Sequence, residues 1–172
     1  MDQIPLPFIL ARNSSLNHIG HEAWVASVGG CGLRKRQATL MPTIRAQGKQ
    51  IVPLVIIFRG TGAGIKDTEL EYYRSLPGIV VKFQPKAWCD ERVMVWYVRE
   101  VLVPALAAAG ISREILMFLD NLGAHKTDYA LEAMRAVGVY FEFTAPGCTD
   151  VCAPVGNLQT SLSRVCVRAF HI

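Results

Sequence analysis

Apolar runs separated by loops that contain Gly or Pro predict alternating strands and helices after an irregular first segment. Residues 1–37 are rich in Pro, Gly, Asn and Ser, with one short strand-like run from Trp24 to Val28. Two strand-like runs follow, Ala38 to Arg45 and Ile51 to Phe58, and the loop between them contains Gly48. This pattern predicts an antiparallel β-hairpin.

The second half of the chain alternates between strand and helix patterns. Asp90 is followed by apolar residues at helical spacing, which predicts a helix to about Gly110 with a kink at Pro104. The other expected elements are strands at Ile79–Phe83, Ile115–Leu119 and Val139–Phe143, and helices from Lys126 or Thr127 through Ala136 and from about Asn157 to Phe170. Right-handed crossovers would make the last two strands parallel.

One of these strands ends in a carboxylate. The run Ile115–Leu119 is short and wholly apolar, which is typical of a strand buried on both faces, and Asp120 and Asn121 follow it. Ligands collect at the carboxyl ends of strands in open α/β sheets, and a carboxylate there can hold a divalent cation. Because Asp is also a good turn and capping residue, this segment alone leaves metal binding and capping equally open.

Composition indicates one globular domain spanning residues 1–172. The chain is 51% apolar and 19% charged, which excludes an intrinsically disordered protein. Charged residues and Pro104 interrupt the longest apolar stretch, and the first residues lack the positive charges of a signal peptide. We therefore expect a nuclear or cytoplasmic protein that is neither secreted nor held in a membrane.

Cysteine content and net charge do not narrow the possible functions further. The five cysteines are scattered and odd in number, so we interpret them as reduced thiols, although Cys148 and Cys152 have a spacing that zinc could use. The net charge of +4 comes partly from the cluster Arg34–Arg36 and fits either polyanion binding or a solvated face. The loop Gly60–Lys66 matches neither standard phosphate-binding pattern, which favours a surface connection.

Several short segments, taken in order, carry a family resemblance. They are Met1-Asp2-Gln3-Ile4-Pro5, Lys35–Thr39, Pro53–Gly60, Leu119-Asp120-Asn121 with Ala124-His125, and Thr149–Pro154. The first resembles the Met-Asp-Glu-Thr-Pro signature around the first catalytic aspartate of DDE-type transposases in the pogo and mariner-like branch. The resemblance covers nearly the whole chain.

The resemblance implies a fold and a set of metal ligands. The fold would be α/β and ribonuclease H-like: a mixed sheet, with an antiparallel hairpin plus parallel strands, flanked by helices. Asp2 matches the first metal-binding acid and Asp120 the second, with Mg²⁺ or Mn²⁺ as cofactor and Asn121 and His125 as supporting residues. For His125, a polar residue at a helix start remains an equal alternative.

The third acid position departs from the family pattern. Gly156 stands where the acid is expected and Ala153 where the family has Gln, while Asp150 lies upstream and is a weak substitute. Two cations held by carboxylates promote in-line attack on a phosphodiester, and a glycine supplies no ligand. We therefore expect weak or no activity.

The resemblance also implies two missing parts. The strand that leads into Asp2 would be central, pairing with the hairpin on one side and the Asp120 strand on the other. Because this chain starts one residue before Asp2, we expect that strand to be largely missing unless Pro5–Leu10 or a partner chain fills the gap. We also expect no N-terminal helix-turn-helix module.

These features give one main function and two alternatives. The main expectation is a degenerate, transposase-derived DDE endonuclease-like domain that acts on DNA, alone, as a homodimer or with a parent transposase chain, and without a small-molecule cofactor. The first alternative is a non-catalytic DNA- or protein-binding module domesticated from a transposon, and the second is a flavodoxin-like domain. The expected nucleic-acid contacts are Arg34, Lys35, Arg36, Lys82 and Lys86.

Overall fold

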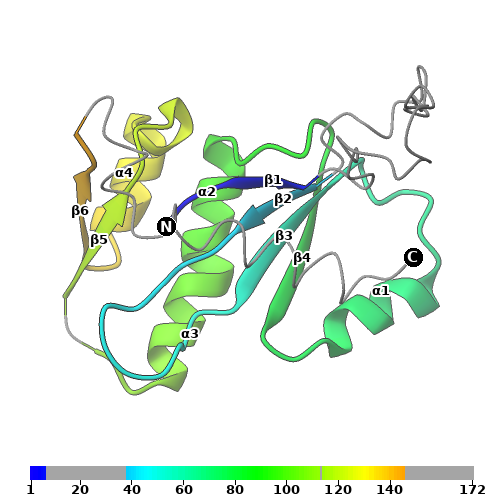
Figure 1. The fold of residues 1–172 in the computed structure, drawn as a ribbon, viewed down its shortest axis with the longest axis horizontal. Coiled ribbons are helices and arrows are strands. Elements are labelled where there is room, and N and C mark those ends of the chain that lie inside the picture. The colour runs from blue at the N-terminus through cyan, green and yellow to red at the C-terminus, as the bar shows by residue number, and fades with distance from the viewer. Residues whose placement is uncertain (7–37, 113, 146–172) are drawn as a thin grey trace, which may run out of the picture.

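A computed structural model describes residues 1–6, 38–112 and 114–145 (Figure 1). Its strands form a four-stranded sheet of order β1-β2-β3-β4 and a two-stranded sheet of β5 and β6. The strands are β1 Ile4–Leu6, β2 Ala38–Met41, β3 Leu54–Arg59, β4 Ile79–Gln84, β5 Ile115–Leu119 and β6 Val139–Phe143. The helices are α1 Asp67–Ser75, α2 Glu91–Tyr97, the π-helical η2 Val98–Leu102, α3 Val103–Ala108, the 3-10 helix η3 Gly123–His125 and α4 Asp128–Arg135.

The predicted hairpin is present, with shorter strands than expected. β2 and β3 pair antiparallel, with Ala38 opposite Phe58 and Met41 opposite Val55. The paired segments stop short of Pro42 and Pro53, because a proline has no backbone N–H to donate to a strand ladder. This antiparallel pairing contradicts the flavodoxin-like alternative, which requires mainly parallel strands from the start.

The sheet arrangement corrects one expectation and confirms another. β5 and β6 pair in parallel, as predicted, and β4 pairs in parallel with β3. However, β5 does not share a sheet with the hairpin: β1 lies at the edge of β2, and among the described residues no strand joins β1 to β5. Pro5 and Leu6, two of the residues expected to fill the place of the central strand, do pair with the hairpin at β2, but not with β5. The backbone contact across the gap is a hydrogen bond from the amino group of Met1 to Phe118 O, 2.9 Å long.

One long helical segment packs against both sheets. Asp90 caps α2, since its Oδ1 accepts from Val93 N at 2.9 Å, as the sequence predicted. The interruption expected at Pro104 is the π-helical turn η2 just before it, in which Val103 N–H bonds to Val98 O. One buried core joins this segment to the strands and to α4. Its members include Met41, Val55, Ile57, Val93, Met94, Tyr97, Val98, Leu102, Met117, Leu119, Ala130 and Met134. The structure is therefore a mixed α/β domain that is compatible with a ribonuclease H-like arrangement.

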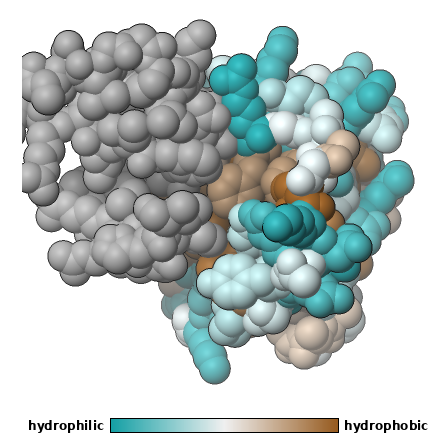
Figure 2. All heavy atoms as spheres, turned by 90° about the vertical axis from the view of Figure 1, so that its right-hand side faces the viewer, coloured by the Kyte–Doolittle hydropathy of each residue, from teal (hydrophilic) through white to brown (hydrophobic). Residues whose placement is uncertain are grey.

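Helix α1 was not predicted, because it has no buried residue and so leaves no amphipathic pattern in the sequence. Between α1 and β4 lies a hollow of about 450 Å³, lined by residues such as Leu70, Tyr73 and Arg74. Figure 2, which views this end of the molecule, shows apolar surface bordered by hydrophilic side chains.

Among the described helices, none has the length and apolar character needed to cross a bilayer. The predicted strand at Trp24–Val28 and helix at Asn157–Phe170 lie outside the described residues.

Candidate functional site

The carboxyl ends of β5 and β6 meet at one edge of their sheet. The two strands run in parallel and in register, with Leu119 opposite Phe143. Thr144 N donates to Leu119 O at 2.9 Å, and the side-chain amide of Asn121 donates to Thr144 O. The turn that carries Asp120 is therefore tied to the end of the neighbouring strand, which fixes the start of the following loop.

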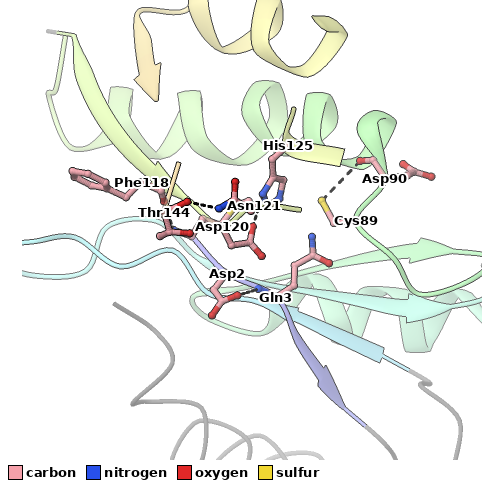
Figure 3. Close-up of polar contacts among 10 residues, drawn as sticks. Asp2, Gln3, Cys89, Asp90, Phe118, Asp120, Asn121, His125 and Thr144 are labelled. Atoms are coloured by element: carbon pink, nitrogen blue, oxygen red, sulfur yellow. Dashed lines mark hydrogen bonds and ion pairs between the residues drawn. The ribbon is translucent and has the colours of Figure 1, made fainter. Parts of the chain in front are cut away.

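Asp2 reaches the same place from the other sheet. Asp2 N donates to Pro42 O at 3.3 Å, and its carboxylate accepts from Gln3 N at 2.7 Å. Figure 3 shows Asp2 and Asp120 in the same region, with the Asp2 carboxylate hydrogen-bonded to Gln3 N. Burial raises the pKa of Asp2, its hydrogen bond from Gln3 N–H lowers it, and the negative charge of Asp120 raises it further. Asp120 is therefore near enough for its charge to raise the pKa of Asp2, while the positive Met1 amino group lowers it.

His125 contacts Asp120 directly. Its side chain is 0% exposed, and Nδ1 lies 2.6 Å from Asp120 Oδ1. Both ring nitrogens are buried, and neither Nδ1 nor Nε2 makes a hydrogen bond of acceptable geometry among the described residues, so the Nδ1–Oδ1 approach is close without being a hydrogen bond. Thr127 caps α4, since its hydroxyl accepts from Ala130 N at 3.3 Å, so His125 is not the helix-capping residue. Asp120 does not cap η3 either, because the residue at that position is Leu122.

Sequence reasoning missed two neighbours of this site, Cys89 and Gln3. Cys89 is a free, buried thiol, and burial together with the charges of Asp90 and Asp120 raises its pKa to about 12. The side-chain Nε2 of Gln3 is buried without a partner among the described residues. Figure 3 shows both side chains near His125. Nothing in the local pattern marks them, because only the tertiary fold brings them to Asp120.

The donor set suits a hard divalent cation in part. Asp2 and Asp120 supply carboxylate oxygens, the ligands that Mg²⁺ prefers, and Mg²⁺ keeps several waters when proteins bind it. No group of three or more His, Cys, Asp or Glu side chains able to hold a metal occurs among the described residues. The other positions considered for the third acid, Asp150 and Gly156, lie outside them.

Two of the predicted nucleic-acid contacts, Lys82 and Lys86, lie in the part of the chain that the structure describes. Arg34, Lys35 and Arg36 lie outside the described residues. Lys82 lies on β4, which β2 and β3 separate from β1, and its Nζ sits 4.6 Å from the centre of the Trp96 ring.

Lys86 is exposed on the loop after β4. Its backbone N–H donates to Gln84 Oε1 at 2.6 Å, and the same loop continues to Cys89. Of these two lysines, Lys86 therefore belongs to the segment that leads toward Asp120, and Lys82 does not.

Comparison with known proteins gives one match. A family model described as DDE superfamily endonuclease matches residues 35–156. No curated protein and no solved structure matches the chain. The matched region contains Asp120, Asn121 and His125 but not Asp2, so the link of Asp2 to this site depends on its position in the structure.

Proposed function

Because the chain belongs to the DDE superfamily endonucleases, we propose that it is a transposase-derived domain that binds DNA and cleaves phosphodiester bonds with a divalent cation. The observation that carries this proposal is that the Met1 amino group bonds to Phe118 O on β5, which brings Asp2 into the neighbourhood of Asp120 although the two are distant in sequence. We assign the domain to the pogo and mariner-like branch and its sheet to the ribonuclease H-like class.

In this proposal Asp2 and Asp120 hold the cation. Endonucleases of this superfamily generally use Mg²⁺ or Mn²⁺. The bound metal would activate a water or a DNA 3′-hydroxyl and stabilise the leaving oxygen during in-line attack. The coupled charges of the two carboxylates support this role, since a divalent cation between them would relieve their repulsion.

His125 and Asn121 act as positioning residues. The buried imidazole holds Asp120 through the contact between Nδ1 and Oδ1, which limits the rotation of the carboxylate. Asn121 ties the same turn to Thr144 and so fixes the backbone that carries Asp120. Neither residue needs to touch DNA for these roles.

Gly156 favours a second candidate function. It stands where the resemblance places the third acid, and among the described residues no third side chain completes a metal-binding group. With two carboxylates, one cation site would be kept and the second weakened. A non-catalytic DNA- or protein-binding module is therefore the alternative, and either form would act in the nucleus, where DNA is found.

Plasmid nicking separates the two candidates. Purified protein is incubated with supercoiled plasmid in Mg²⁺ and in Mn²⁺, beside Asp120→Asn and the matched control Asp128→Asn, a surface carboxylate on α4. Nicking that disappears only in Asp120→Asn supports an endonuclease. No nicking by folded wild type, with activity gained on Gly156→Asp, supports the binding module with a degenerate site.

A further inference from the structure

Two cations beside the candidate site stand over aromatic rings. Lys126 Nζ lies 5.3 Å from the centre of the Phe143 ring, and Arg135 Cζ lies 5.2 Å from that of Phe141. Both cationic side chains belong to exposed residues. A ring face attracts a cation without occupying all its N–H groups, so an exposed cation held in this way can still donate to a ligand.

The two rings are neighbours on one strand. Phe141 and Phe143 lie on the same face of β6, because side chains alternate along a strand, and their ring centres are 5.8 Å apart. Phe143 is opposite Leu119, the residue before Asp120, and Phe141 is opposite Met117. Lys126 is therefore placed beside the Asp120 end of the sheet, and Arg135 is placed beside the middle of β6.

Carboxylates do not neutralise this pair. Among the described residues, neither Lys126 nor Arg135 has a carboxylate within ion-pair distance. Helix α4 carries exposed Asp128 and Glu132, and neither forms an ion pair with these cations. The packing against aromatic rings limits the motion of the two side chains, which lowers the entropy lost when they bind an anion.

We propose that Lys126 and Arg135 form a phosphate-binding pair that receives the backbone of a DNA strand on its way to Asp120. This assignment rests on the proposed function for its ligand, DNA, but not on cleavage. It adds two residues to the expected nucleic-acid contacts: Lys126, which follows η3 and lies over the last residue of β6, and Arg135, which ends α4 and lies over the middle of β6. Contacts to phosphate are independent of sequence, so the pair would position DNA rather than select a base.

The test measures DNA affinity apart from chemistry. A short fluorescein-labelled DNA duplex is titrated with full-chain protein in EDTA, and fluorescence anisotropy is followed at several salt concentrations. The variants are Lys126→Gln, Arg135→Gln and the double variant. The matched controls are Lys66→Gln, an exposed lysine just before α1, and Arg74→Gln, an exposed arginine in the last turn of α1.

The expected result is a few-fold loss of affinity for each single variant and about a 10-fold loss for the double variant, with the controls unchanged. The slope of log affinity against log salt should fall by ~2 in the double variant, because two phosphate contacts are lost. Phe143→Leu should weaken binding less than Lys126→Gln, since it removes the ring and keeps the charge.

Three results would overturn the proposal: no DNA binding by wild type, equal affinity of wild type and double variant, or an equal loss in the α1 controls. Binding by wild type to an acidic protein in preference to DNA would also contradict it. The proposed endonuclease fails independently of this test. If wild type binds DNA through the pair but does not nick plasmid, the endonuclease proposal fails and the phosphate-binding pair is kept. If wild type nicks plasmid and the double variant binds DNA normally, the phosphate-binding pair fails and the endonuclease proposal is kept.

Discussion

His125 Nδ1 lies 2.6 Å from Asp120 Oδ1, and the histidine side chain is fully buried while the carboxylate keeps 16% of its side-chain surface exposed. Removing the ring should leave both a cavity and a half-buried acid without its contact. We expect His125→Ala to lower the free energy of unfolding by about 2–3 kcal/mol. Urea unfolding of His125→Ala, Asp120→Asn and the double variant measures the coupling, and additive effects would contradict a direct interaction.

Asp2→Asn should separate stability from metal binding. Burial and the charge of Asp120 raise the pKa of Asp2 above its ordinary value, so ionisation of Asp2 opposes folding as the pH rises above 3.8. The variant should therefore melt at a higher temperature than wild type at pH 7 in EDTA, and the difference should shrink near pH 4. Mg²⁺ should raise the melting temperature of wild type but not of Asp2→Asn, because a ligand stabilises only the form that binds it. A matched Mg²⁺ response in both proteins would exclude Asp2 as a ligand.

Two leucines of equal size test the description of the core. Leu40 on β2 is 0% exposed, whereas Leu116 on β5 is 56% exposed, so the expectation that β5 is buried on both faces is wrong for the face that carries Leu116. We expect Leu40→Ala to lower the free energy of unfolding by about 2–5 kcal/mol and Leu116→Ala by less than about 0.5 kcal/mol. Chemical denaturation of the two variants gives the comparison. A large loss at Leu116 would show that its face of the sheet is covered in solution.

Cys89 gives a pH dependence of known sign. Burial raises the pKa of its thiol from 9.0 to about 12, so the folded protein keeps the neutral thiol where the unfolded chain ionises. The contribution of this pKa difference to the free energy of unfolding is complete below pH 9. It is lost as the pH rises, by about 1.4 kcal/mol per pH unit between the two pKa values. Cys89→Ala should lose less stability than wild type between pH 8 and pH 10. Parallel pH profiles for the two proteins would contradict this prediction.

The segments that the sequence predicted well are those whose signal is local. The sequence predicts β6 at Val139–Phe143, and the strand has those bounds, because Gly138 precedes it and the sequence pair Pro146-Gly147 follows it. The helix cap at Asp90 could also be predicted locally, because Asp at the start of a helix commonly accepts a hydrogen bond from the backbone N–H three residues later, here that of Val93. Helix α1 has no such signal in the sequence, because none of its residues is fully buried.

The candidate site depended on long-range contacts that no local pattern records. The position of Asp120 at the end of β5 could be predicted, and the resemblance named His125 as a supporting residue without predicting its contact with Asp120. The proximity of Cys89 and Gln3 to His125 could not be predicted, since they lie in segments just before α2 and β1 that are distant in sequence. The contacts of Lys126 and Arg135 could not be predicted either, because their partners are aromatic rings on β6.

The π-helical turn Val98–Leu102 has a consequence for how this helix tolerates changes in length. A residue gained or lost in a regular α-helix turns everything beyond it by about 100°, which would carry a buried face into solvent. A π turn is one extra residue held within an α-helix, so deletion of the exposed Arg99 or Glu100 should restore an α-helical turn and leave Val93, Met94 and Leu106 on their original faces. Homologous chains should therefore differ by single-residue gaps here more readily than elsewhere in the helix.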